Sequence, residues 1–246
     1  MKIGLIQMKV CPGEKDKNIN HALELLEEAA SQSDIVILPE LWSIGYDFHD
    51  LKQNATCLGD CLCQKLSYMA KKNKTIILAG TLPIAKNKKM KNTMLIFNKK
   101  GKLSASYSKR HLYHGYLESK LMQPGDKLLK YSIDGVHIGA AVCYDFYFPK
   151  MWRKMAKEGI TLVAAPSSWP ADHIQTWDVL TRARAIENRI CIAAVNMVGN
   201  YRGISMCGHS RFVDPLGNVI TEAGEEETIL YAEYDKEKYD KEKYKN

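Results

Sequence analysis

The sequence has no apolar stretch that approaches the length of a membrane-spanning helix, so we expect no membrane partner. It also has no linker rich in Pro, Gly or Ser. We therefore expect its 246 residues to form a single domain over residues 1–234, followed by a charged tail at residues 235–246. Strand-like residues 2–8 begin the chain directly, and we expect no signal peptide and a cytoplasmic protein.

The seven cysteines lack the features of a disulfide framework or a zinc site. Their number is odd and no secretion signal is expected, which is typical of a reducing compartment. Cys57, Cys61 and Cys63 lie close together, but no second pair of Cys or His follows at the spacing of a zinc ribbon. We interpret the three as structural thiols and expect no metal site.

The net charge of +7 could indicate a nucleic-acid-binding protein. The Lys residues are scattered, however, and no aromatic residues alternate with them to form a platform for stacked bases. We therefore expect a solvated surface and no nucleic-acid partner. The tail at 235–246 is nearly all charged or Tyr, which predicts a short exposed helix or a disordered end.

Helical and strand patterns alternate along the chain, which predicts an α/β fold with a mixed sheet, or two sheets with helices outside. The strands are expected at residues 2–8, 35–38, 75–81, 136–142, 160–165 and 190–196, in a hairpin at 92–108, and near 209–213, 218–221 and 229–234. The helices are expected at residues 18–30, 60–72, 149–158 and 172–188.

Cys143 ends the apolar run at residues 136–142 and is soon followed by Pro149, a pattern that predicts a buried strand leading through a turn into a helix. The partial positive charge at a helix N-terminus lowers the pKa of a thiol and favours a nucleophile there. A lone buried Cys is more commonly a small hydrophobe, so its interpretation depends on other segments.

Two charged residues also follow predicted strands. Glu40 comes after the strand at 35–38, and Lys109 comes after the hairpin at 92–108. Either one alone would be interpreted as a solvated surface residue, but strand ends converge when the strands share a direction. A buried Glu can accept the proton of a thiol, and a Lys can stabilise the oxyanion that forms when the thiolate attacks a carbonyl.

This trio resembles the catalytic Glu-Lys-Cys set of the nitrilase superfamily of carbon-nitrogen hydrolases. Six matches occur in family order, from Lys2 to about Tyr234: Leu38–Trp42; Lys109–Leu112; Glu118–Ser119 with Gln123–Asp126; Val142–Asp145 with Phe148–Pro149; Arg182–Asn188; and Gly208–Ser210 with Asp214–Gly217. The resemblance implies a four-layer α-β-β-α sandwich.

The resemblance also implies a cofactor-independent thiol amidohydrolase. Cys143 would attack a small amide or N-carbamoyl compound, Glu40 would shuttle the proton, and hydrolysis of the thioester would follow the release of ammonia. Lys109 and the backbone N–H of Tyr144 would stabilise the oxyanion. Glu118 would orient Lys109 and the substrate.

The family pattern further suggests pocket residues and an assembly. Tyr46, Tyr144 and Trp169 are expected to contact the substrate, with packing in the loops or core as the alternative for Tyr46 and Trp169. A homodimer or higher homo-oligomer is expected, because the helix after Cys143 is the usual dimer surface of the family. In this chain Met151, Trp152 and Met155 would supply its apolar area.

Alternative functions remain open from the sequence. A nitrilase would use the same trio on a nitrile, and an omega-amidase would use it on a dicarboxylate mono-amide. Many relatives have Arg where this chain has Tyr147, which weakens the case for a dicarboxylate mono-amide. A non-catalytic scaffold predicts the loss of at least one member of the trio, and all three are present.

Overall fold

The computed structural model describes residues 1–86, 89–115 and 117–243, and two sheets form its centre. In order across the first sheet, the strands are β15 (Thr228–Glu233), β1 (Lys2–Gln7), β2 (Ile35–Ile37), β3 (Ile76–Leu78), β5 (Lys89–Phe97) and β4 (Leu82–Lys86), with β6 (Leu103–Ser108) paired to β5. The second sheet has the order β14 (Val219–Glu222), β13 (Arg211–Val213), β10 (Cys191–Val195), β9 (Leu162–Pro166), β8 (Val136–Ala140) and β7 (Tyr131–Ile133).

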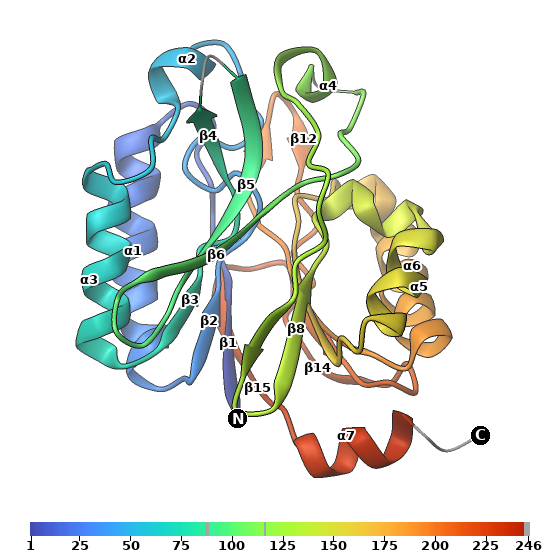
Figure 1. The fold of residues 1–246 in the computed structure, drawn as a ribbon. Helices are drawn as coiled ribbons and strands as arrows, with labels where there is room; N and C mark the ends of the chain where they lie inside the picture. The colour runs from blue at the N-terminus through green and yellow to red at the C-terminus, as the bar shows by residue number, and fades with distance from the viewer. Residues whose placement is uncertain (87–88, 116, 244–246) are drawn as a thin grey trace.

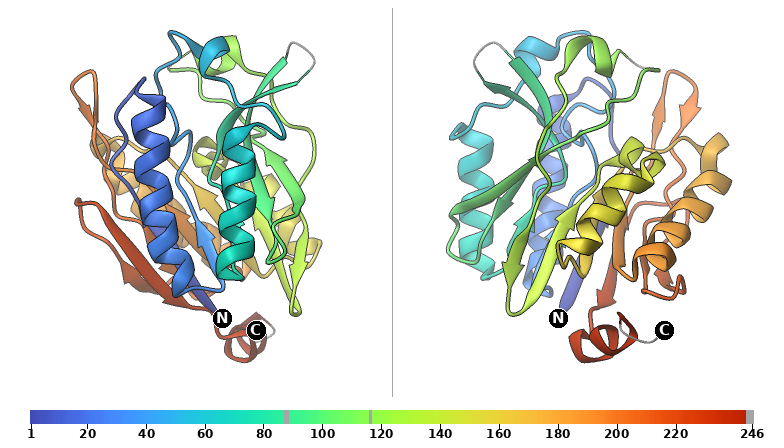
Figure 2. Two further views of the ribbon diagram at one scale, coloured as in Figure 1. Left: turned by 90° about the vertical axis from the view of Figure 1, so that its left-hand side faces the viewer. Right: turned by 45° about the vertical axis from the view of Figure 1, so that its right-hand side comes forward.

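Helices cover the outer face of each sheet and complete four layers, as Figures 1 and 2 show. The first sheet is covered by α1 (Lys15–Ser31) and α3 (Cys61–Asn73), and the second by α5 (Pro149–Lys157) and α6 (Ile174–Asn188). Shorter elements are α2 (Leu51–Asn54), α4 (Glu118–Leu121), α7 (Lys236–Lys243), the 3₁₀ turns η1 (Cys143–Tyr147) and η2 (Ala171–His173), and the hairpin of β11 (Asn200–Tyr201) and β12 (Ile204–Ser205). The predicted α-β-β-α sandwich is therefore confirmed.

The central strands are apolar on both faces because both faces are buried. In β1, Ile3 and Leu5 pack between the two sheets, whereas Ile6 packs against the helices on the outer side. Each fully buried aliphatic side chain of this kind contributes about 1.5–3 kcal/mol to folding. This double burial explains why the runs read as continuously apolar rather than as alternating.

Four strands of the described chain were not predicted: β4, β7, β11 and β12. Residues Leu82–Lys86 form β4, which pairs antiparallel with β5 and extends the expected hairpin into a three-stranded unit. Pro83 lies in this segment and reads as a strand breaker in the sequence. It is accommodated because β4 is at the edge of its sheet, where a missing N–H donor is tolerated.

The prediction that three side chains of α5 supply the apolar area of a dimer surface is wrong. Met151, Trp152 and Met155 of α5 are buried in the core between α5, α6 and the second sheet. A side chain that already fills the core of its own subunit cannot supply apolar area to a partner. The amphipathic spacing of these residues instead reflects the packing of α5 against the second sheet.

The tail is partly built into the fold. Residues 236–243 form α7, and Tyr239 is buried against Phe212 and Tyr234 at one end of the core. The expectation of an exposed helix is therefore wrong for Tyr239, although the neighbouring charged residues Lys236 to Lys238 are exposed. The last three residues of the predicted tail lie outside the described residues.

Both sheets direct their strand ends to one region. Strands β1, β2 and β3 run parallel in the first sheet, and β8, β9 and β10 run parallel in the second. The loops after β2 and β8 carry Glu40 and Cys143, respectively. The sequence suggested that the strand ends converge, and they do so because the two sheets face each other.

Candidate active site

Glu40 is held in a tight loop that follows β2. A Cβ at Gly80 would collide with the carbonyl oxygen of Pro39, so the loop can approach only a glycine at this position. The loop is fixed further by Thr81, which donates its N–H to the Pro39 carbonyl at 3.0 Å and accepts the Leu41 N–H at 2.9 Å. Glu40 is fully buried as a result.

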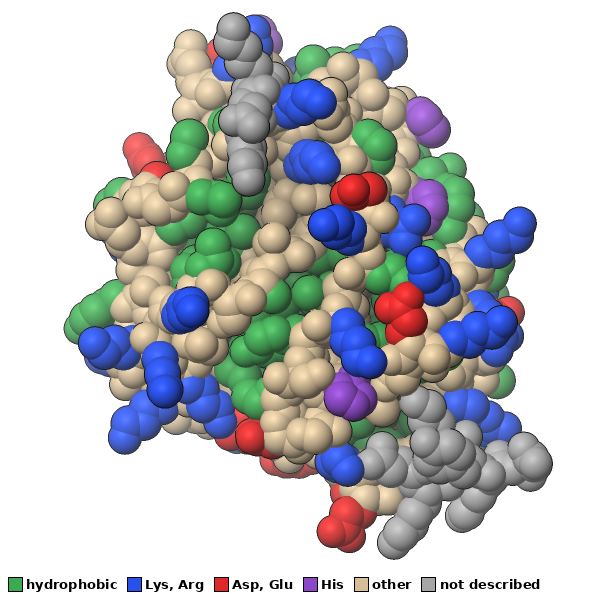
Figure 3. Space-filling model, viewed as in Figure 1, with side chains coloured by type: hydrophobic (Ala, Val, Ile, Leu, Met, Phe, Trp, Pro, Cys, Tyr) green, Lys and Arg blue, Asp and Glu red, His purple; other side chains and the backbone are tan. Residues whose placement is uncertain are grey.

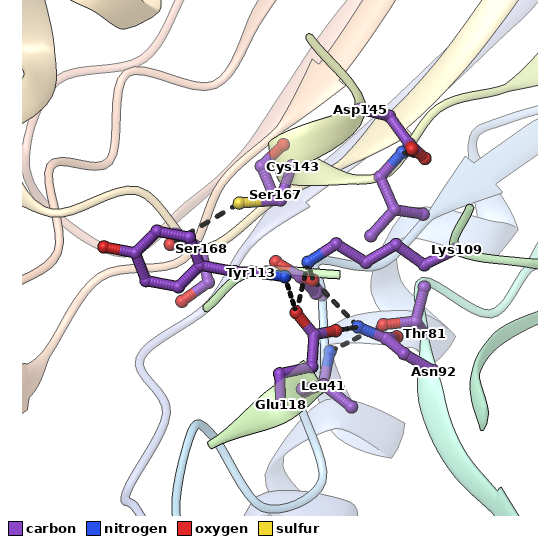
Figure 4. A network of polar contacts seen from close by, with 12 residues as sticks. Leu41, Thr81, Asn92, Lys109, Tyr113, Glu118, Cys143, Asp145, Ser167 and Ser168 are labelled. Atoms are coloured by element: carbon purple, nitrogen blue, oxygen red, sulfur yellow. Dashed lines mark hydrogen bonds and ion pairs between the residues drawn. The ribbon is translucent and has the colours of Figure 1, made fainter. Parts of the chain in front are cut away.

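Lys109 lies between two buried carboxylates, and Figure 4 shows its side chain close to one of them, Glu118. Its Nζ donates to Glu40 Oε1 and to Glu118 Oε2, each at 2.8 Å, and all three side chains are fully buried. The Tyr46 hydroxyl is 3.4 Å from the same ammonium. Burial alone would lower the pKa of Lys109, but the charges of Glu40 and Glu118 raise it above its usual range, so the residue is a permanent cation.

Asn92 completes this network and was missed from the sequence. Its Nδ2 donates to Glu40 Oε1 at 2.9 Å and to Glu118 Oε1 at 2.8 Å. Its backbone carbonyl accepts the backbone N–H of Lys109 at 2.8 Å. An Asn in a strand that precedes a turn has no distinctive signal in the sequence. Only the pairing of β5 with β6 brings it beside Lys109.

The two carboxylates are bonded differently. Glu118 uses both oxygens, because Oε1 accepts from Asn92 and Oε2 accepts from Lys109 and from the Tyr113 N–H at 2.8 Å. Glu40 uses Oε1 alone, and its buried Oε2 has no hydrogen-bond partner among the residues that the structure describes. Burial raises the pKa of Glu40 and outweighs the opposing charge of Lys109. Glu40 therefore combines an unpartnered oxygen with the raised pKa that suits a proton acceptor.

Cys143 begins η1 with a φ of 45°, in the left-handed region that a non-glycine residue rarely adopts. Such strain is common where a side chain must be presented to a ligand. Its Sγ points toward the Ser168 carbonyl, at 3.9 Å, and in Figure 4 the thiol and the Lys109 ammonium approach the same space.

The expected lowering of the thiol pKa is wrong. Burial raises the pKa of Cys143 well above its usual value, and the charge of Glu40 adds to the effect. The charge of Lys109 lowers the pKa but does not compensate. A short 3₁₀ turn has a weak dipole, so the thiol is neutral at rest and needs a base to become a nucleophile.

A cavity of about 80 Å³ lies over Cys143. Its walls are mostly aromatic, and they include the three residues predicted to contact the substrate: Tyr46, Tyr144 and Trp169. Trp169 lines the cavity and also packs in the core beneath it, and its contact with a substrate stays a prediction. The volume admits only a small ligand or the reactive end of a larger one.

The comparisons with known proteins agree with this geometry. A model of the carbon-nitrogen hydrolase family matches residues 2–244. This chain belongs to the carbon-nitrogen hydrolase family. The 2-oxoglutaramate amidase of Bacillus subtilis is 34% identical to it over 233 residues, which cover 95% of this chain and 90% of that protein.

Solved structures of other carbon-nitrogen hydrolases share the fold. The crystal structure of Nit3 from Saccharomyces cerevisiae, a member of branch 10 of the nitrilase superfamily, has a TM-score of 0.89 at 30% identity and covers 98% of this chain and 92% of its own. A mutant of the amidase from Nesterenkonia sp. AN1, with acrylamide added at its active-site cysteine, has a TM-score of 0.86 at 27% identity, covering 96% and 93%. The prediction of a thiol amidase that cleaves non-peptide C–N bonds is therefore confirmed for this carbon-nitrogen hydrolase.

Asp145 connects the loops of Lys109 and Cys143 in this carbon-nitrogen hydrolase. Its Oδ2 accepts from the Tyr107 hydroxyl at 2.7 Å and from the Val142 N–H at 2.9 Å. Its Oδ1 accepts the backbone N–H of His111 at 3.0 Å and lies 2.7 Å from the His111 Nδ1. These contacts give His111 a structural role next to Lys109, and Asp145 itself was not singled out from the sequence.

Neither a metal cluster nor a membrane span is found in the described part of the chain. No group of three or more His, Cys, Asp or Glu side chains there could hold a metal ion. No described helix is long and apolar enough to cross a membrane. Cys57, Cys61 and Cys63 are all free thiols, the first two exposed and the third buried.

Proposed function

We propose that Cys143 is the nucleophile of this hydrolase, Glu40 its general base and acid, and Lys109 its oxyanion donor. The substrate is a small amide or N-carbamoyl compound bound in the aromatic cavity. Glu118 positions Lys109 and the substrate, and Tyr46, Tyr144 and Trp169 contact the substrate. The observation that carries this proposal is the carboxylate of Glu40, which is buried, linked to Lys109 through Oε1 and left without a partner at Oε2 among the described residues.

The reaction begins with proton transfer from the Cys143 thiol to Glu40. The thiolate sulfur forms a bond to the amide carbon, and the carbonyl oxygen becomes an oxyanion beside the Lys109 ammonium and the backbone N–H of Tyr144. Glu40 then gives its proton to the nitrogen, the C–N bond breaks, and ammonia leaves a thioester. Glu40 takes a proton from water, whose oxygen attacks the thioester carbon and displaces the Cys143 thiolate. The carboxylic acid leaves, and Glu40 returns its proton to the thiolate.

The substrate class is supported by the relatives and by the chemistry of the site. Named relatives are a 2-oxoglutaramate amidase and the omega-amidase NIT2 of Mus musculus, which is 32% identical over 251 residues and aligns with 96% of this chain and 89% of its own length. The same thiol, base and cation would also serve a nitrile. Amide hydrolysis is favoured because the named relatives are amidases.

The first experiment measures ammonia release from a panel of omega-amides, N-carbamoyl amines, simple aliphatic amides and nitriles. We expect release from an amide or N-carbamoyl substrate and its loss in Cys143→Ala. Cys57→Ala, which changes an exposed thiol outside the cavity, is the matched control and should retain activity. Release that survives in Cys143→Ala would contradict the proposal.

We also propose a homodimer that pairs through the exposed face of α6. Val179 and Ile186 lie two turns apart on this helix and are 61% and 46% exposed, and Leu216, which precedes the Gly217 that lies against Ile186, is 46% exposed. Exposed apolar side chains that cluster in this way are typical of an interface. Sedimentation should give a dimer mass that becomes a monomer mass in Ile186→Lys, whereas a monomeric wild type would contradict the proposal.

We also propose that the protein is cytoplasmic. All seven cysteines are free thiols, as expected in a reducing compartment. Fractionation of cells that express the tagged chain should place it with soluble cytoplasmic markers, and its recovery from a secreted fraction would contradict this location.

A further inference from the structure

The cavity over Cys143 has no charged residue to receive a carboxylate. Among the described residues that line it, none is Lys, Arg, Asp or Glu. The walls are instead formed by aromatic rings, chiefly Tyr113, Tyr144, Tyr147, Trp169 and Tyr201. His173 is the one basic side chain in this lining set.

The aromatic rings are arranged as a continuous wall. Tyr147 stacks on Trp169 with 5.7 Å between centroids and 5° between planes. Tyr144 contacts Tyr147 at 5.2 Å and Tyr113 at 5.5 Å between centroids. The negative face of an aromatic ring attracts a cation, tolerates an apolar group and repels an anion.

The buried charged groups next to the cavity add no net positive charge. Glu40 and Glu118 together carry two negative charges when ionised, and Lys109 carries one positive charge, so the network has a net charge of −1. Because all three are fully buried, solvent screens this charge poorly. A second negative charge at the far end of a substrate would be unfavourable in this surrounding.

Arg202 is an exposed cation close to the cavity but outside its lining. The Arg202 guanidinium is 5.2 Å from the centroid of Tyr201 and lines a neighbouring hollow that also contains Asp47 and His49. Across the molecular face drawn in Figure 3, Lys and Arg side chains are spread between neutral and acidic ones. Arg202 is therefore an alternative receptor that the experiment must exclude.

From these contacts we infer that this hydrolase prefers amides whose far end is cationic or uncharged over amides whose far end is a carboxylate. The inference rests on the proposed function, because it assigns the substrate class of the same site. It separates this chain from a relative that is named for 2-oxoglutaramate. Tyr147, half-exposed at the wall of the cavity, is the residue that sets this preference.

The test uses three primary amides that share a two-methylene spacer and end in a carboxylate, an isopropyl group or an amidinium. Binding to Cys143→Ala is measured by calorimetry at about pH 8, where an unperturbed imidazole is neutral. We expect the amidinium and isopropyl amides to bind roughly tenfold or more tightly than the carboxylate. Tyr147→Arg in the same background should reverse the order.

Equal or tighter binding of the carboxylate amide would overturn the inference, and so would binding of none of the three. If Arg202→Gln then abolished the binding of the carboxylate amide, Arg202 would be the receptor and the inference would be wrong. Turnover by the wild type is measured separately. If the preferred amide binds but releases no ammonia, the proposed function fails while the charge preference stands.

Discussion

The two carboxylates on either side of Lys109 show how the same side chain acquires two roles. Glu118 comes from α4 and is bonded through both oxygens to Lys109, Asn92 and the Tyr113 N–H. Glu40 comes from the loop after β2, and one of its oxygens remains without a described partner. A carboxylate with hydrogen bonds at both oxygens holds its neighbours in place. A carboxylate with one unpartnered oxygen and a raised pKa can exchange a proton.

The largest effect is expected from Glu40→Gln. The amide keeps the size of the side chain and an oxygen for Lys109, but it cannot accept the thiol proton. We expect kcat to fall by about 10²–10⁴-fold, the range of general acid–base catalysis, without loss of the folded state. Steady-state kinetics and a melting curve check this, and near-wild-type kcat would assign the base elsewhere.

Glu118→Gln is the matched substitution on the other side of Lys109. Its amide oxygen can still accept from Lys109 or the Tyr113 N–H, so the loss arises from a shifted ammonium rather than from a missing base. We expect kcat to fall by up to about 10²-fold, less than in Glu40→Gln. A larger loss than in Glu40→Gln would reverse the assigned roles.

The state of the thiol sharpens the comparison further. Because burial and Glu40 raise the pKa of Cys143, the residue stays protonated below that pKa, so the resting enzyme should contain no Cys143 thiolate between about pH 6 and 8. The difference in ultraviolet thiolate absorbance between wild type and Cys143→Ala measures this. A thiolate at neutral pH would mean that the charge of Lys109 dominates.

The smallest effect on activity is expected from Tyr107→Phe. This change removes the 2.7 Å hydrogen bond to Asp145 and leaves the other contacts of that carboxylate in place. A hydrogen bond to a charged group contributes about 1.5–3 kcal/mol, which corresponds to a lower melting temperature by several degrees. An unchanged melting temperature would show that Asp145 does not depend on this bond.

Much of the fold, and three residues that meet at the candidate site, could be predicted from the sequence. Glu40 and Cys143 follow apolar runs, and Lys109 follows the hairpin strand β6, so the patterns that define the strands also locate the strand ends. The strand β4 was missed because Pro83 signals a break, and only its place at the sheet edge makes that signal misleading. Local patterns cannot reveal which strand becomes an edge.

The rest of the site depends on contacts between distant segments. Asn92 joins Glu40 and Glu118 across separations of 52 and 26 residues, and Asp145 reaches Tyr107 across 38. The thiol pKa was predicted in the wrong direction because the sequence shows the helix start but not the burial or the neighbouring carboxylate. Met151 and Trp152 were assigned to a surface because amphipathic spacing does not say which face is covered.

The most direct test of the account is the pH dependence of kcat/KM for the wild type and the two Gln variants. Because the pKa of Glu40 is raised, wild-type activity should fall as the pH drops through a midpoint above about 4.3, the ordinary value for Glu. In Glu118→Gln this limb should persist and move to lower pH, because the charge of Glu118 contributes to the raised pKa. In Glu40→Gln the limb should disappear from the residual activity. A limb that persists in Glu40→Gln and disappears in Glu118→Gln would contradict the central claim.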